Sequence, residues 1–168
     1  MAVIFQSKKW LIMFSMLFCS VMQVMAQSTG PAQVSNKDIA TQYVNDIVNN
    51  QKLYLLKYVY DTGYVFHNLD GKDSYSMRDS SLLSSLYNTF TTFPDLHYTI
   101  INSVAEGELV ALNLSVTGTQ RADYMGIKAT QKTVNYKEML MFRFLNNKIV
   151  EGWGLSNIAD LKAQLSKP

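Results

Sequence analysis

The sequence predicts an α+β domain: a cone-shaped, strongly curved antiparallel sheet with three N-terminal helices packed on its concave face and a short C-terminal helix. Between residues 35 and 90 apolar residues recur at helical spacing, whereas from His97 onward they alternate with a period of two. Helices followed by antiparallel strands are typical of domains whose helices cover one face of a sheet. Because few helices would cover a long sheet, the sheet has to curve to bury that face, which would leave a conical cavity.

Three helices are expected before the main run of strands. Ser35, with Asp38 three residues later, predicts an N-cap, and the apolar spacing carries the first helix to about Asn49. A second, shorter helix is expected over 52–60, and a third over about 79–90, where Pro94 prevents any continuation. The face of the third helix that we expect to be buried consists of Leu82, Leu83, Leu86, Tyr87 and Phe90.

The strands are predicted from alternation and from turn residues. A short strand over 64–67 and a loop over 68–76 precede the third helix. Four longer strands follow, over 97–104, 109–120, 133–144 and 148–153. Asn146 and Asn147 predict a tight hairpin between the last two strands. Residues 157–165 have apolar residues at helical spacing and predict the C-terminal helix.

The first 26 residues predict a secretory signal peptide. Lys8 and Lys9 precede an apolar run over 10–21, and Ala26 ends a stretch of small residues suited to a signal peptidase. The run is shorter than the ~20 residues of a membrane span, which disfavours an anchor. Cys19 offers the alternative of a lipoprotein, although the bulky Phe18 before it suits a lipoprotein peptidase badly. We therefore expect an exported protein, periplasmic or secreted, with a flexible leader over 27–33 and one domain over 34–165.

The charge and cysteine content limit the partners of the exported chain. Two of the fifteen basic residues lie in the predicted signal, which leaves thirteen basic and thirteen acidic residues in the rest. A neutral chain lacks the basic surface typical of proteins that bind nucleic acid or anionic membranes. The single cysteine lies in the signal, and no metal-ligand or nucleotide-binding spacing is present, so we expect no metal and no cofactor.

A series of short motifs runs through the predicted domain in a fixed order. The motifs are 93–96 (Phe-Pro-Asp-Leu), 106–108 (Glu-Gly-Glu), 117–119 (Thr-Gly-Thr), 124–127 (Tyr-Met-Gly-Ile), 142–144 (Phe-Arg-Phe), 148–153 (Lys-Ile-Val-Glu-Gly-Trp) and 164–165 (Gln-Leu), with weaker matches at 63–67 and 78–79. In this order and spacing the sequence resembles the SnoaL-like polyketide cyclase (ester cyclase-like) family of the nuclear transport factor two-like superfamily, roughly over residues 34–165. The resemblance implies a conical pocket, and a cofactor-independent reaction in which a pocket carboxylate removes a proton next to a carbonyl.

The sequence departs from the family at the position of that carboxylate. The family places it four residues after the tryptophan of a Glu-His-Trp motif, which here gives Asn157, and the histidine of the motif is Gly152. Asparagine does not exchange protons near neutral pH, so the family mechanism does not carry over at this position. Asp160 would replace it only if the register slipped.

Two other residues are candidates for acid–base catalysis. Glu138 alternates with apolar residues on its strand, so it either points into the pocket or, if the strand bulges, is solvated. His67 ends the first strand, where the family often has a histidine, and is either a pocket base or a structural histidine at the rim. The residues expected to line a ligand pocket are Tyr64, Tyr98, Tyr124, Met125, Tyr136, Arg143, Trp153 and Asn157. Arg143 could instead form a structural salt bridge, and the aromatic residues could form a plain core.

Three functions remain open at this point. The first is an exported domain that binds a small apolar or aromatic-carbonyl molecule. The second is a cyclase, isomerase or hydratase that uses Glu138 or His67. The third is a non-catalytic module that forms a homodimer through the open sheet face, where Asn113, Ser115 and Thr117 would meet a partner.

Overall fold

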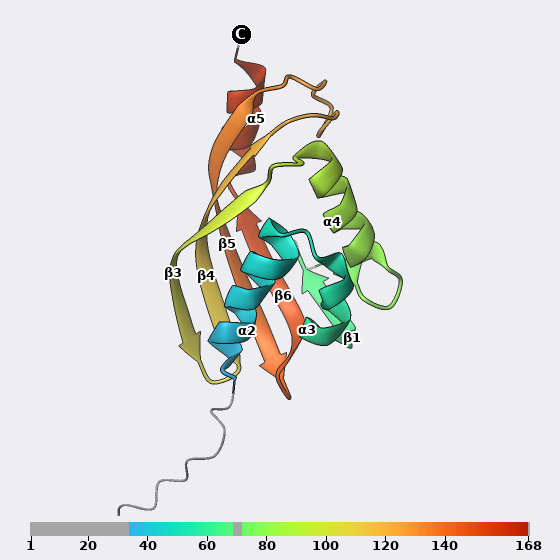
Figure 1. Cartoon of the computed structure of the whole chain (residues 1–168), viewed down its shortest axis with the longest axis vertical. Coiled ribbons are helices and arrows are strands. Elements are labelled where there is room, and N and C mark those ends of the chain that lie inside the picture. The colour runs from blue at the N-terminus through green and yellow to red at the C-terminus, as the bar shows by residue number, and fades with distance from the viewer. Residues whose placement is uncertain (1–33, 69–71, 168) are drawn as a thin grey trace, which may run out of the picture. The chain divides into compact units, whose positions relative to one another are not determined.

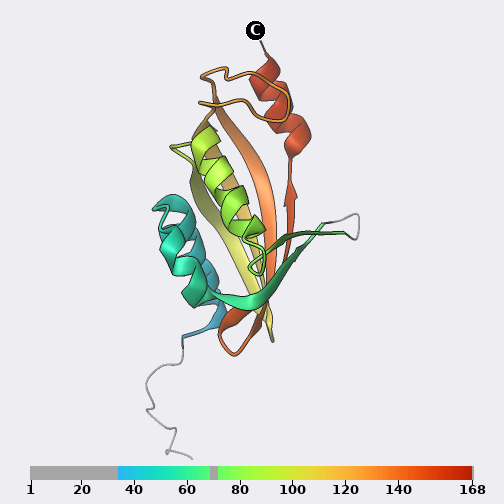
Figure 2. The same ribbon diagram turned by 90° about the vertical axis from the view of Figure 1, so that its right-hand side faces the viewer.

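The computed structural model describes residues 34–68 and 72–167, and the chain from Val34 onward forms one compact unit. The predicted signal peptide and leader lie outside the described residues. The predicted α+β class and the curved sheet are confirmed: Figures 1 and 2 show the helices α2, α3 and α4 on one side of a single sheet.

The sheet has six strands in the order β2-β1-β6-β5-β4-β3. The strands are β1 (Tyr60–His67), β2 (Asp73–Ser76), β3 (His97–Glu106), β4 (Leu109–Thr119), β5 (Thr133–Leu145) and β6 (Lys148–Ser156). Neighbouring strands are antiparallel except β1 and β6, which are parallel. The predicted hairpin at Asn146 and Asn147 is confirmed, with φ of 50° and 60°, the left-handed values that a two-residue hairpin turn requires.

The helices are formed by short segments that differ in their winding. The α-helix α2 (Asn36–Gln42) leads into a π-helix, η2 (Tyr43–Asn49), and a 3-10 turn, η3 (Leu53–Leu55), leads into α3 (Leu56–Val59). Two longer helices follow, α4 (Ser81–Thr92) and α5 (Ile158–Ser166). The predicted cap is confirmed: the Ser35 hydroxyl accepts a hydrogen bond from the Asp38 amide at 3.1 Å, and the Asp38 carboxylate accepts one from the Ser35 amide at 3.2 Å.

Alternation along the strands divides the sheet into two faces. The helix-side face carries Val110, Leu112, Leu114 and Val116 of β4, all fully buried, and Tyr136, Glu138, Leu140 and Phe142 of β5. Tyr43 of η2 packs edge-on against Phe142 with 5.3 Å between ring centroids, which joins this face to the helices. The open face carries Met139 and Met141 of β5 and Trp153 and Leu155 of β6.

Several local expectations were wrong. Residues 73–76 form a strand rather than a loop, because they pair with β1 and Tyr75 packs on Phe66 at 5.7 Å. Such a short strand depends on its neighbour and leaves little local pattern. The strand β1 also begins earlier than expected, at Tyr60.

The buried face of α4 is narrower than the sequence predicted. Leu82 and Phe90 are buried and Leu86 packs against the core, but Leu83 and Tyr87 are 43% and 66% exposed. Leu82, Leu86 and Phe90 follow one another at four-residue spacing and form one stripe. Leu83 and Tyr87 lie about 100° further around the helix and fall outside it.

Candidate functional site

Glu138 is a buried carboxylate on the helix-side face of β5. It is 9% exposed, and it pairs with Leu114 of β4 on one side and Ser156 of β6 on the other. The Ser156 hydroxyl donates a hydrogen bond to Oε2 at 2.8 Å, and the Tyr98 hydroxyl lies 3.3 Å from both carboxylate oxygens. Among the described residues no cation pairs with this carboxylate.

This environment makes Glu138 a better proton acceptor than an ordinary glutamate. Burial raises the pKa of its carboxyl above 4.5, and the hydrogen bonds from Ser156 and Tyr98 offset only part of that rise. Burial and the negative charge of Glu138 in turn raise the pKa values of Tyr98, Tyr124 and Tyr136. These tyrosines therefore remain neutral hydrogen-bond donors at physiological pH.

Tyr98 is held in place through its backbone. The Asn49 side chain, at the last residue of η2, accepts a hydrogen bond from the Tyr98 amide at 2.7 Å and donates one to the Tyr98 carbonyl at 3.0 Å. This double contact fastens β3 to the end of the π-helix. π-Helical turns are rare and often occur at functional sites. Here the π-helix η2 ends at Asn49, which supports Tyr98, a hydrogen-bond partner of Glu138.

The hydroxyl of Tyr136 faces accessible space beside Glu138. No buried side-chain nitrogen or oxygen in the described part of the chain lacks a hydrogen-bond partner. Tyr136 makes no side-chain hydrogen bond there although the residue is only 8% exposed, so its hydroxyl has to be accessible. A polar donor that reaches open space next to a basic carboxylate is a feature of ligand sites rather than of a filled core.

Deeper on the helix-side face, Tyr43, Tyr60 and Tyr64 form a buried cluster. Tyr60 lies edge-on to both others, with centroids 5.8 Å from Tyr43 and 4.4 Å from Tyr64. Burial raises the pKa of Tyr43 to about 12. The Tyr64 hydroxyl lies 2.5 Å from the point where a Cβ on Gly152 would sit, so only glycine fits there. The histidine that the family motif implies at this position is incompatible with Tyr64.

An open groove of about 850 Å³ lies at the rim of the domain. It is bordered by α4, by Tyr75 of β2 and by residues 122–125 of the loop between β4 and β5. Tyr124 packs edge-on against Phe93 at 5.4 Å, and Met125 next to it is half exposed. The loop is anchored by the buried Gln120, whose side chain donates to the Ile127 carbonyl and accepts from the Thr130 amide and hydroxyl.

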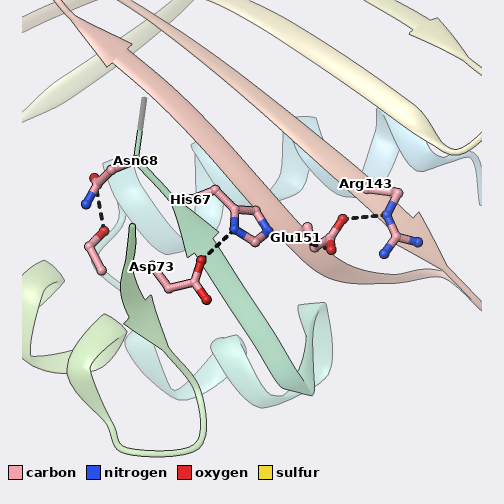
Figure 3. A network of polar contacts seen from close by, with 6 residues as sticks. His67, Asn68, Asp73, Arg143 and Glu151 are labelled. Carbon is pink, nitrogen blue, oxygen red and sulfur yellow. Dashed lines mark hydrogen bonds and ion pairs between the residues drawn. The ribbon is translucent and has the colours of Figure 1, made fainter. Parts of the chain in front are cut away.

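His67 lies on the open face, away from Glu138. Its Nδ1 is 2.7 Å from the Asp73 carboxylate, and its Nε2 is 3.6 Å from Glu151 (Figure 3). Arg143 donates from Nε to the other oxygen of Glu151 at 2.6 Å. The ring of Trp153 packs on His67 with 5.1 Å between centroids. These residues form one network on the open face, so the structure does not bring His67, Arg143 and Trp153 together with the interior tyrosines.

Asn157 also lies outside the helix-side interior. It is exposed, and its Oδ1 accepts a hydrogen bond from the Asp160 amide at 3.2 Å, which makes it the N-cap of α5. The residue of this segment that reaches the interior is Ser156, through its contact with Glu138. Sequence reasoning missed Ser156, Asn49 and Tyr43. Only alternation along β6 could have suggested Ser156, because it shares a face with Gly152 and Gly154.

The described part of the chain contains no group of three or more histidine, cysteine, aspartate or glutamate side chains able to hold a metal ion. Within the same residues no helix is long and apolar enough to cross a membrane.

The curved sheet with the helices on one face has the nuclear transport factor two-like fold. Residues 38–165 match the model of the SnoaL-like polyketide cyclase family, and the chain belongs to that family. The family match supports a small-molecule binding or cyclase-type domain. No curated protein gives a significant match.

Solved structures of similar fold come from several bacteria. AclR, a proposed hydroxylase from Streptomyces galilaeus, is 25% identical, with a TM-score of 0.71 over 79% of this chain and 96% of its own. IdmH, a proposed polyketide cyclase from Streptomyces antibioticus, is 23% identical, with a TM-score of 0.69; the match covers 79% of this chain and 99% of IdmH. A SnoaL-like polyketide cyclase from Agrobacterium tumefaciens is 19% identical, with a TM-score of 0.67; the match covers 80% of this chain and 100% of the Agrobacterium protein. The two below 25% identity establish the fold alone.

Proposed function

We propose that the protein binds a small apolar or aromatic carbonyl compound on the helix-side face, and that Glu138 removes a proton next to the carbonyl. The observation that carries this proposal is a buried carboxylate with a raised pKa and no cationic partner among the described residues. A carboxylate that is paired for stability alone would have its pKa lowered by a cation. A buried and unpaired one costs folding free energy, and such sites are often functional.

The surrounding tyrosines supply the second part of the chemistry. In the reaction the α-carbon–hydrogen bond breaks, the proton moves to a carboxylate oxygen of Glu138, and the electron pair forms an enolate. The accessible hydroxyl of Tyr136 is suited to donate a hydrogen bond to the enolate oxygen. Return of the proton to another carbon gives an isomerase. Attack of the enolate carbon on a second carbonyl forms a carbon–carbon bond, and the alkoxide that results takes the proton back from Glu138, which gives a cyclase. In this scheme the exposed amide of Asn157 has no part.

Proton exchange tests the proposal without the natural ligand. We expect the protein to accelerate exchange of the α-protons of 2-tetralone with deuterium oxide, measured by proton NMR. Glu138→Gln should lower the protein-catalysed rate at least ~100-fold, the lower range of a general-base contribution. His67→Ala and Asn157→Asp should leave it within about threefold, because both positions lie outside the interior. Loss of exchange in His67→Ala with normal exchange in Glu138→Gln would assign the base to His67 and contradict the proposal.

A homodimer through the open face is a second candidate property. Met139 and Leu155 are 54% and 56% exposed and lie opposite each other on β5 and β6, beside the pair of Met141 and Trp153. A cluster of exposed apolar side chains is typical of a protein interface.

Export of the protein is also part of the proposal. It is supported by residues 8–26, where two lysines precede an apolar run and a stretch of small residues.

One native mass spectrum of the protein purified from its host tests both properties. We expect a chain that begins at Gln27 and a species of twice that mass. A chain that retains residue 1 would contradict export. A monomer at micromolar concentration would contradict the dimer and leave the interior site unaffected.

A further inference from the structure

The rim groove between α4 and the loop of residues 122–125 has an unusual chemical character, because neutral polar side chains dominate its lining. One wall is the side of α4 that carries Ser84, Ser85 and Asn88. The aromatic residues Tyr75 and Tyr124 belong to the rest of the border. The groove thus combines hydroxyl and amide groups with two aromatic rings.

Part of this polar lining is already used within the protein. The hydroxyls of Thr89 and Thr92 donate to carbonyls of their own helix at 2.9 Å, and Ser81 bonds the backbone of Ser76. By contrast, the side chains of Ser84, Ser85 and Asn88 make no hydrogen bond to any described residue. Two hydroxyls and one primary amide are therefore available, each able to donate and to accept.

The groove offers no free charge to a ligand. Among the residues that line it, the one charged at neutral pH is Asp123, whose Oδ2 accepts from the Lys128 ammonium at 2.7 Å while Oδ1 accepts from the Ala129 amide at 3.1 Å. These hydrogen bonds lower the pKa of Asp123 and satisfy both oxygens. An anionic or cationic ligand would find no counter-charge here, whereas a neutral ligand with several hydroxyl groups would replace the water on Ser84, Ser85 and Asn88.

Tyr124 links the groove to the helix-side face of the sheet. It borders the groove and packs edge-on against Phe93 at 5.4 Å, and the Phe93 Cβ lies 3.2 Å from the point where a Cβ on Gly118 of β4 would sit. Gly118 lies on the same face of β4 as Leu114, which pairs with Glu138. A ligand that contacts Tyr124 can thus lie along the groove at one end and extend over the helix-side face toward Glu138 at the other.

We infer that the groove binds a neutral polyhydroxylated group, such as a glycosyl unit, carried by the same molecule whose apolar carbonyl part reaches Glu138. A sugar ring offers hydroxyl groups on its rim and C–H groups on its faces, which match the amide and hydroxyl wall and the tyrosine rings. The inference rests on the proposed function, since it assigns the remainder of the ligand of that site.

Three related ketones test the inference. Binding of 4-hydroxyacetophenone, its β-D-glucoside and its cyclohexyl ether is measured by isothermal titration. The ether matches the size of the glucoside and lacks its hydroxyl groups. We expect the glucoside to bind at least ~10-fold more tightly than either other compound. In the double variant Ser84→Ala/Asn88→Ala this advantage should fall to less than threefold, while the affinity for 4-hydroxyacetophenone stays within twofold. Asn102→Ala, at an exposed asparagine of β3, is the matched control and should keep the advantage.

The other outcomes separate this inference from the proposed function. If the glucoside has no advantage, or keeps it in the double variant, the inference is overturned. Tighter binding of the cyclohexyl ether would show that the groove selects apolar groups and would also overturn it. In each case the Glu138-dependent exchange of 2-tetralone is measured separately, so the proposed reaction stands or fails on its own result.

Discussion

Glu138→Gln is expected to make the folded protein more stable at neutral pH while it removes the proposed base. Glutamine has the same shape, and its amide can still bond Ser156 and Tyr98 because both hydroxyls can donate or accept. The Glu138→Gln variant therefore keeps these contacts and avoids the unfavourable free energy of burying the Glu138 carboxylate charge. Each unit by which the pKa of the carboxyl is raised corresponds to about 1.4 kcal/mol in the free energy of unfolding above that pKa.

The stabilisation should depend on pH in one direction. Below pH 4.5 the carboxyl is protonated in both the folded and the unfolded protein, so the variant gains nothing. As the pH rises from 4.5 through the raised pKa of the folded state, the unfolded chain loses its proton first and the wild type becomes relatively less stable. Urea unfolding of both proteins at pH 4 and pH 8 checks this. Glu106→Gln, at the exposed end of β3, is the control and should change the free energy of unfolding by less than ~0.5 kcal/mol. A Glu138→Gln variant less stable at pH 8 would contradict the account.

Gly152→Ala is expected to destabilise the fold by about 2–3 kcal/mol, the upper range for overpacking a rigid core. The new Cβ would lie 2.5 Å from the Tyr64 hydroxyl and 3.4 Å from Phe142. Tyr64 is 1% exposed and packs against Tyr60, so its ring has no free direction in which to move. Chemical unfolding of the purified variant measures the effect.

A double-mutant cycle identifies the cause of that loss. Tyr64→Phe removes the clashing oxygen, keeps the ring that packs against Tyr60, and should itself change the free energy of unfolding by no more than about 1 kcal/mol. The double variant Tyr64→Phe/Gly152→Ala should be at least ~1 kcal/mol more stable than the sum of the single effects predicts. Costs that add within ~0.5 kcal/mol would show that the hydroxyl is not the obstacle.

The fold was predictable where the pattern is local. Alternation along β4 and β5 identified their buried faces, and the cap at Ser35 and the turn at Asn146 follow from residue chemistry over a few positions. The strand β2 was missed because it forms only by pairing with β1, and the π-helical winding of η2 leaves no mark in the apolar spacing.

The candidate site was less predictable than the fold. The face of Glu138 followed from alternation, since its neighbours in the strand are apolar. By contrast, His67 was placed by analogy with the family, yet the register of β1 on β6 pairs it with Trp153 on the open face. Asn157 was placed by counting from Trp153, and that count cannot show that the residue leaves the sheet to cap α5.

The pKa of Glu138 is the most direct test of the central claim, that a buried and unpaired carboxylate is the proton acceptor of the interior. Carbon-13 NMR of glutamate-labelled protein follows the carboxyl signal that disappears in Glu138→Gln as the pH is raised. The account predicts a titration midpoint clearly above 4.5. A midpoint at or below 4.5 would show a carboxylate held in its charged form by the protein, and would contradict its role as the base.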